Sequence, residues 1–181
     1  MALKASVARL KLQLADLDRQ LYRDFPLTLA RHPSETAARM MLRVLAFALH
    51  ADEQLAFGRG ISTDEDPDLW QKNLDGTIDS WIELGTPAPE RLKRACGRAQ
   101  RVTLYAYGDR AVPVWWSRHQ AALERLDRLS VMQVGDGAMQ ALAGAFQPGM
   151  ILQCTISEGG AMLSWDQGSL IITPTALKAA A

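Results

Sequence analysis

Two acidic side chains on one short stretch are the residues of this sequence with the clearest potential for chemistry. Residues 77–85 read Thr-Ile-Asp-Ser-Trp-Ile-Glu-Leu-Gly. The alternation predicts a β-strand with Asp79, Trp81 and Glu83 on one face and mainly apolar side chains on the other. Because a carboxylate is costly to cover with protein unless it has a partner, two of them on one sheet face indicate a binding or catalytic site.

A preceding strand supplies a partner for Glu83. The dipeptide Asp75-Gly76 predicts a hairpin turn between residues 67–73 and 77–85. A two-residue turn there places Asp68 opposite Glu83, and cross-strand partners on one face have Cβ atoms ~5 Å apart. Two carboxylates at that distance can bind one divalent cation through their oxygens. The sequence therefore predicts Asp68 and Glu83 as a metal-binding pair.

Asp79 is the alternative partner for Glu83. The two residues lie on the same strand, and four rises of ~3.3 Å separate them by roughly 13 Å, which is too far to share one ion. The same register places Lys72 opposite Asp79 as an exposed ion pair and Trp70 opposite Trp81. A longer turn would shift the register and bring Asp79 forward, so the sequence leaves both partners open.

A third acid, Glu35, lies at the start of a predicted helix. Ser34 is the expected N-cap of a helix that runs to about residue 51, and Glu35 falls in its first turn, where a carboxylate interacts favourably with the helix dipole. Arg39 follows one turn later on the same side of the helix. This spacing predicts an ion pair between Glu35 and Arg39.

The remaining elements predict a mixed α+β fold. Strand, helix and strand over residues 77–107 predict a right-handed crossover and a parallel strand pair. An N-terminal hairpin is predicted over residues 5–30, with Pro26 at a sheet edge or a bulge. Further helices are expected at residues 90–100, 113–126 and 136–145, and further strands at 101–107, 129–134, 150–156, 161–165 and 169–173. The last three strands form a C-terminal meander.

Composition excludes several classes of protein. The 181 residues carry 20 basic and 20 acidic side chains, so there is no overall basic charge of the kind that many nucleic-acid-binding proteins have. Cys96 and Cys154 have neither metal-ligand spacing nor a disulfide framework, which favours a reducing, cytoplasmic location. No apolar run approaches the ~20 residues of a membrane helix. The length predicts a single domain over residues 1–181.

The sequence resembles two known groups of proteins. Residues 34–107, with helix, three strands, helix and strand, a Pro67-Asp68 dipeptide and a late Glu83, resemble the core of the PD-(D/E)XK nuclease superfamily. The additional β elements then cover residues 1–31 and 129–173. Over its whole length the chain is similar to the bacterial YaeQ family, on the residues Met1-Ala2-Leu3-Lys4, Leu29 to Thr36, Ile78-Asp79, Trp81 to Gly85 and Trp115-Trp116.

The nuclease resemblance implies a function for the acids. Asp68 and Glu83 map onto the carboxylates that bind a divalent cation, usually Mg²⁺, which polarises a phosphate and helps to generate hydroxide. Glu35 matches an extra acid that some members carry on the first helix. The expected activity is metal-dependent hydrolysis of nucleic acid, and the protein partner is not specified.

One position departs from the nuclease pattern. The motif places a lysine two residues after its second acid, and this sequence has Gly85 there. Lys93, on the following predicted helix, could bring an amine to the same point, and Lys72 is a second candidate. The missing lysine supports an alternative, in which the fold is retained as a non-catalytic interaction or regulatory protein, including one that acts in transcription.

Overall fold

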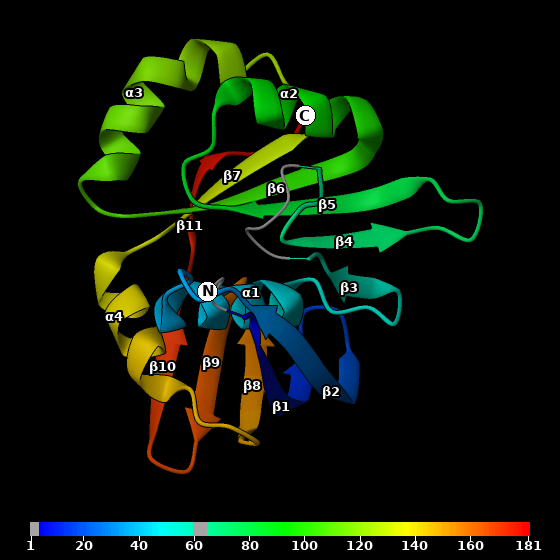
Figure 1. Cartoon of the computed structure of the whole chain (residues 1–181). Coiled ribbons are helices and arrows are strands. Elements are labelled where there is room, and N and C mark those ends of the chain that lie inside the picture. Colours follow the sequence, from blue (N-terminus) through cyan, green and yellow to red (C-terminus); the bar gives the residue numbers. More distant parts are fainter. Residues whose placement is uncertain (1–3, 60–64) are drawn as a thin grey trace.

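The computed structural model describes residues 4–59 and 65–181 as two mixed β-sheets and four helices (Figure 1). The mixed α+β class expected from the sequence is confirmed. The two sheets form separate layers, one below and one above the first helix in the view of Figure 1. The helices are α1 (Ala37–Leu49), α2 (Pro89–Arg98), α3 (Ala111–Leu123) and α4 (Asp136–Ala145).

The lower sheet joins the two ends of the sequence. Its strand order is β10-β9-β8-β1-β2, so the predicted N-terminal hairpin and C-terminal meander are confirmed but belong to one sheet. The parallel pair of β1 and β8 connects them. Because β2 is an edge strand, it tolerates Pro26. The strands are β1 (Ser6–Asp16), β2 (Leu21–Arg31), β8 (Ile151–Ser157), β9 (Gly160–Trp165) and β10 (Gly168–Ile172).

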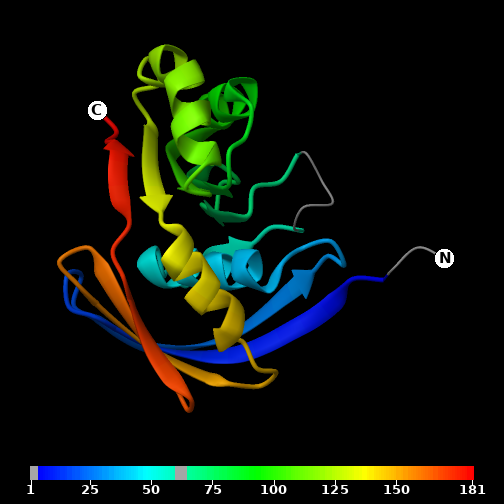
Figure 2. The same ribbon diagram turned by 90° about the vertical axis from the view of Figure 1, so that its left-hand side faces the viewer.

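The upper sheet carries the acidic strand. Its order is β11-β7-β6-β5-β4-β3, with β3 to β5 antiparallel and β5 to β7 parallel, as the predicted crossover requires. The last strand was not expected from the sequence, and it returns from the lower sheet to pair with β7 (Figure 2). The strands are β3 (Leu55–Phe57), β4 (Leu69–Lys72), β5 (Ile78–Leu84), β6 (Ala99–Tyr107), β7 (Leu129–Val134) and β11 (Thr175–Lys178).

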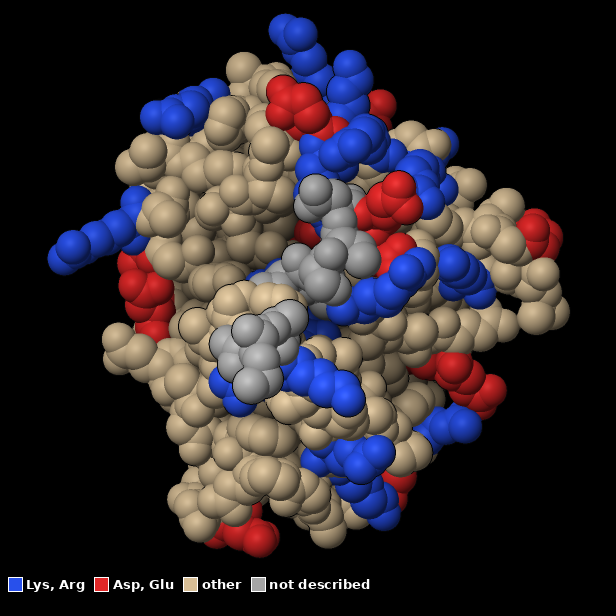
Figure 3. All heavy atoms as spheres, viewed as in Figure 1, with Lys and Arg blue, Asp and Glu red and all other residues tan. Residues whose placement is uncertain are grey.

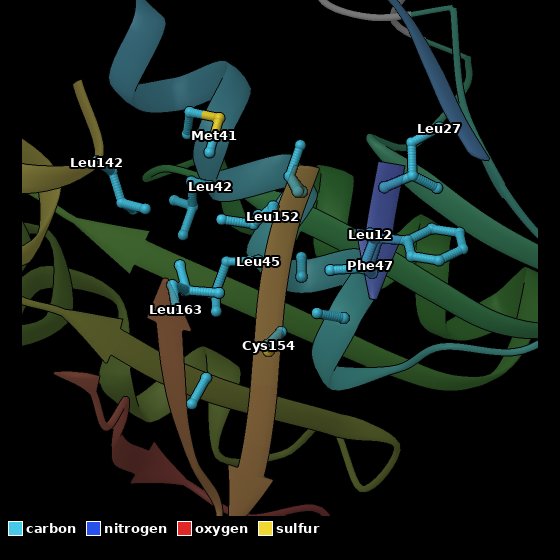
Figure 4. Packing of buried hydrophobic residues seen from close by; sticks show 14 of the residues in the cluster. Leu12, Leu27, Met41, Leu42, Leu45, Phe47, Leu142, Leu152, Cys154 and Leu163 are labelled. Carbon is cyan, nitrogen blue, oxygen red and sulfur yellow. The ribbon is translucent and has the colours of Figure 1, made fainter. Parts of the chain in front are cut away.

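The helix α1 lies between the two sheets and is the centre of the main core. Met40, Met41, Leu42 and Leu45 have no exposed surface, because the lower sheet and α4 cover one side and the upper sheet covers the other. Figure 4 shows α1 side chains on the same side of the lower sheet as leucines from β1, β8 and β9, which belong to the same core cluster. A second core lies on the outer face of the upper sheet beneath α2 and α3. Both faces of β5 are therefore covered.

The hairpin between β4 and β5 differs from the two-residue turn expected from the sequence. The Asn73 amide donates to the Thr77 carbonyl at 2.8 Å, so three residues form the loop, and Gly76 takes a left-handed φ of 85°. A β-bulge absorbs the extra residue and pairs Lys72 with Ile78. The predicted pairing of Lys72 with Asp79 is therefore wrong.

The bulge changes the strand pairing only near the turn, so the register further along the hairpin is as expected. Trp70 pairs with Trp81, which confirms that part of the prediction, and Leu69 pairs with Ile82. The next positions outward are Asp68 and Glu83. The two acids therefore reach neighbouring positions at the far end of the hairpin, although the turn was predicted incorrectly.

The start of α1 also differs from the prediction. Thr36, rather than Ser34, is the N-cap, and its hydroxyl accepts a hydrogen bond from the Arg39 amide at 3.1 Å. The Ser34 hydroxyl instead lies 2.7 Å from Nδ1 of His32. Glu35 therefore precedes the helix rather than lying in its first turn, and its carboxylate is available for contacts outside the helix.

His50, the C-cap residue of α1, gives a testable pH dependence. Its Nε2 lies 2.7 Å from the Tyr105 hydroxyl, and burial, with smaller effects of Arg19 and Arg101, lowers its pKa from 6.5 to about 4. Between these pH values the unfolded chain binds a proton that the folded protein does not. We expect the unfolding free energy to fall by roughly 3 kcal/mol as pH drops from 6.5 to 4.

Urea unfolding at a series of pH values measures this effect. The variant His50→Gln should remove most of the pH-dependent loss, whereas His119→Gln, on α3, should retain it. An unchanged pH profile in the His50 variant would contradict the assignment.

Candidate functional site

Asp68 is held in place immediately before β4. Its side chain is 5% exposed, and both carboxylate oxygens have partners. The Leu84 amide donates to Oδ2 at 2.9 Å, and Arg39 Nη2 lies 2.8 Å from Oδ1. The first bond ties Asp68 to the end of β5, and the second ties it to α1. Asp68 therefore connects the hairpin to the central helix.

Glu83, at the same end of the hairpin, is 3% exposed and contacts α2 through Arg91. Trp81 Nε1 donates to its Oε1 at 2.8 Å, and Arg91 Nε, on α2, donates to the same oxygen at 2.9 Å. Burial raises the pKa of Glu83 above its ordinary value, although both bonds oppose the shift, and the nearby charge of Asp68 adds to it. The two acids are thus close enough to interact electrostatically.

Glu35 contacts two arginines of α1. Arg43, whose side chain has no exposed surface, binds both carboxylate oxygens, with Nε at 2.9 Å from Oε1 and Nη2 at 2.6 Å from Oε2. Arg39 Nη1 donates to Oε1 at 3.0 Å, which confirms the predicted pair. Since Arg39 also contacts Asp68, it bridges two of the predicted site acids.

We call these six residues the acid–arginine network: Glu35, Asp68, Glu83, Arg39, Arg43 and Arg91. Its three carboxylates and three guanidiniums have formal charges that cancel. Arg43 and Arg91 are the members that the sequence reasoning missed. The available signal was spacing, because Arg43 lies one helical turn beyond Arg39 on the same face of α1.

Tyr107 is a further residue at this site that the sequence did not single out. Arg39 forms a side-chain hydrogen bond with it, and burial raises the pKa of the Tyr107 hydroxyl. Gly85 lies against its ring, where an added Cβ would be 4.0 Å from Cε1. Gly85 has φ of 100°, a conformation that disfavours lysine or any other L-residue. The backbone at this position is therefore built for glycine.

The other predicted site residues lie elsewhere. Lys93 is exposed on α2, two residues after Arg91, so the helix turns it away from the side that contacts Glu83. The Lys72 ammonium lies 3.5 Å from the centre of the Trp70 ring. Asp79 forms an ion pair with Arg101 of β6. The cation beside Glu83 is therefore Arg91 rather than Lys93 or Lys72.

The carboxylates of the acid pair accept hydrogen bonds from nitrogen donors in this structure. Both oxygens of Asp68 accept from nitrogen donors, and Oε1 of Glu83 accepts from two. Within residues 4–59 and 65–181, no three His, Cys, Asp or Glu side chains are grouped as ligands for a metal. The carboxylates that the sequence assigned to Mg²⁺ therefore have arginine partners in this structure, Arg39 for Asp68 and Arg91 for Glu83.

Gly58 fixes the loop that carries Asp68, and its substitution should disturb the site. Its amide donates to the Asp68 carbonyl at 2.9 Å, and an added Cβ would lie 1.9 Å from the Pro67 carbonyl oxygen. We expect Gly58→Ala to lower the unfolding free energy by about 1–3 kcal/mol, because the backbone must move.

Gly144→Ala is the matched control, since an added Cβ on this exposed position of α4 meets nothing within 4 Å. It should raise stability by about 0.5–1 kcal/mol. Equal effects of the two substitutions in thermal unfolding would contradict the close approach at Gly58.

These features define a two-sheet α+β protein with a buried ion-pair network where β4 and β5 meet α1 and α2. A family model described as YaeQ protein matches residues 1–174. The chain is 46% identical to uncharacterized protein YaeQ of Salmonella typhi and 43% identical to that of Escherichia coli strain K12, each over 97% of both chains. The protein belongs to the YaeQ family.

Solved structures support the same assignment. The YaeQ protein of Xanthomonas axonopodis pv. citri is 42% identical and superimposes with a TM-score of 0.94, covering 97% of this chain and 99% of the other. The YaeQ protein of Pseudomonas syringae is 36% identical, with a TM-score of 0.92 and 97% of each chain covered. The family resemblance seen in the sequence is confirmed. Within the described residues, no helix is long and apolar enough to cross a membrane.

Proposed function

We propose that this protein binds nucleic acid through its phosphates on a nuclease-like fold, and that arginines rather than a metal ion neutralise its buried acids. The observation that carries the proposal is the acid–arginine network, in which Arg39 and Arg91 contact the two carboxylates that would otherwise bind Mg²⁺. The function is recognition without metal-dependent hydrolysis. This develops the non-catalytic alternative that Gly85 suggested.

The order of elements supports the nuclease-like part of this proposal. The helix α1 is followed by the antiparallel strands β3, β4 and β5, then by α2 and by β6, which is parallel to β5. Asp68 and Glu83 lie at the adjacent ends of two of these strands. This is the arrangement that the resemblance over residues 34–107 implies.

The charge on α2 supports nucleic acid as the ligand. Its sequence, Pro-Glu-Arg-Leu-Lys-Arg-Ala-Cys-Gly-Arg, carries four basic residues and one acidic residue, although the whole chain is neutral. Blue side chains gather over the position of α2 in the space-filling view (Figure 3). Arg91 anchors this helix to Glu83 and to the Asp66 carbonyl, at 2.9 Å in both cases. The network therefore holds a basic helix face in a fixed position.

A calorimetric titration and a cleavage assay test the proposal together. Mg²⁺ and Mn²⁺ are titrated into the wild type and into the double variant Asp68→Asn, Glu83→Gln, and both proteins are incubated with DNA and RNA. We expect no ion binding that depends on the two acids and no cleavage. Metal-dependent cleavage by the wild type that the double variant lacks would refute recognition without hydrolysis.

The second candidate function is a Mg²⁺-dependent phosphodiesterase. One observation favours it, namely that Asp68 and Glu83 lie close enough for the charge of Asp68 to raise the pKa of Glu83. This candidate requires Arg39 to leave Asp68 when the ion binds. Arg91 could then stabilise negative charge on the phosphate, but it could not act as a general base, because an arginine stays protonated. A cytoplasmic location fits both candidates and stays a prediction.

A further inference from the structure

The helix α2 carries a stripe of three arginines, of which Arg94 and Arg98 are exposed and Arg91 is half-buried. Arg91, Arg94 and Arg98 are spaced i, i+3 and i+7, which places their side chains on one face of the helix. They line a cavity of about 680 Å³ together with Glu65, Trp81, Ala95 and Gly97. A rise of 1.5 Å per residue separates the first and last arginine by roughly 10 Å along the helix. The stripe is therefore long enough to contact several groups of one extended ligand.

Two of the arginines are held in position by neighbouring groups. The guanidinium carbon of Arg98 lies 5.1 Å from the centre of the Trp81 ring, and its Nη1 donates to the Glu65 carbonyl at 3.3 Å. Arg91 binds Glu83, as described above. These contacts limit the side-chain entropy that Arg91 and Arg98 would lose on binding a ligand.

Two of the three guanidiniums retain uncompensated charge. Among the described residues, no carboxylate oxygen lies within 4 Å of the nitrogens of Arg94 or Arg98 in an ion pair, and both side chains belong to exposed residues. Guanidinium groups suit phosphate oxygens because their N–H donors form a planar fork. The cavity therefore has the chemistry of a phosphate site.

We propose that this cavity binds consecutive phosphates of a nucleic-acid strand. This proposal rests on the function proposed above and locates the nucleic-acid-binding site on α2. The roughly 10 Å between Arg91 and Arg98 is longer than one phosphate group, so the stripe can contact more than one phosphate of the same strand. A single mononucleotide fits less well, because Trp81 is 3% exposed and Arg98 covers its ring, so a base finds no open aromatic face there. Contacts to phosphates alone make the binding independent of base sequence.

Fluorescence anisotropy with labelled oligothymidylate, measured in EDTA at several salt concentrations, tests the proposal. The variant Arg94→Glu, Arg98→Glu changes only exposed residues outside the acid–arginine network. We expect its affinity to fall by about tenfold or more and the slope of log affinity against log salt to decrease by about 1.4, for two lost phosphate contacts. The matched control is Arg9→Glu, Arg125→Glu, which makes the same change in charge at exposed positions away from the cavity.

The outcomes separate the cavity from the proposed function. An equal loss of affinity in the variant and in the control would show that the cavity is not the phosphate site. Binding by the wild type would in that case still support the proposed function. Failure of the wild type to bind any labelled DNA or RNA would refute the proposed function. In that event, the melting temperature in the presence of inorganic tripolyphosphate tests whether the cavity binds phosphate. A rise for the wild type that the Arg94, Arg98 variant lacks would support the cavity as a phosphate site, and no rise would overturn it.

Discussion

Substitution of Arg43 by methionine is expected to lower the unfolding free energy by about 3–5 kcal/mol, the usual cost of removing one partner of a buried ion pair. Arg43 has no exposed surface and binds both oxygens of Glu35, whose side chain is 1% exposed. After the substitution, Arg39 is the one charged partner that Glu35 keeps among the residues that the structure describes. At about 2–4 °C per kcal/mol for a chain of this size, thermal unfolding should show a decrease of at least roughly 6 °C.

A double variant separates the lost ion pair from the lost packing of the Arg43 side chain. Glu35→Gln combined with Arg43→Met removes both charges and should restore much of the stability, because an ion pair replaced by neutral groups costs little. Nη1 of Arg43 has no hydrogen-bond partner among the described residues. This buried, unsatisfied donor further reduces the net stabilisation that the Glu35–Arg43 ion pair provides. The exposed residue Arg110 provides the control Arg110→Met. A double variant as unstable as Arg43→Met would contradict this account.

Removal of both Arg39 and Arg91 is expected to create a binding site for a divalent cation. In the double variant Arg39→Ala, Arg91→Ala, the carboxylates of Asp68 and Glu83 lose the guanidiniums that compensate them. Two uncompensated carboxylates in a buried site favour a divalent cation with oxygen ligands. Mn²⁺ should therefore bind to the variant in calorimetry and raise its melting temperature, whereas the wild type should show neither effect.

The same variant with Asp68→Asn added is the control, and it should lose the Mn²⁺ response. The single variant Arg91→Ala should bind Mn²⁺ more weakly than the double variant and should lose less stability. Tight Mn²⁺ binding by the wild type, equal to that of the double variant, would show that the arginines do not compete with a metal for these acids.

The positions of Asp68 and Glu83 were predictable from the sequence because strand register depends on local patterns. Trp70 pairs with Trp81 as expected, and this fixes the two acids at the next positions. Most helices and strands were likewise indicated by the spacing of apolar residues. The three-residue turn was not predicted, because an Asp-Gly dipeptide occurs in two kinds of hairpin. One has a two-residue turn and regular pairing, and the other has a three-residue turn and a β-bulge.

The partners of the acids could not be predicted, because they come from elements distant in the sequence. Arg91 reaches Glu83 from α2, and whether it or Lys93 does so depends on the rotation of that helix about its axis. The helix α1 looked like an ordinary core helix, and a fully buried Arg43 is an exception to the rule that arginines stay exposed. Strand β11 was also missed, since Thr175–Lys178 is only four residues long and gains its stability from β7.

The most direct test of the central claim is the binding of labelled DNA and RNA by the wild type in EDTA and again in Mg²⁺, with the integrity of the probe checked after each titration. Binding through arginines without a metal predicts equal affinity in both conditions once ionic strength is matched, a steep decrease with salt, and an intact probe. Binding that requires Mg²⁺, together with a cleaved probe, would contradict the account.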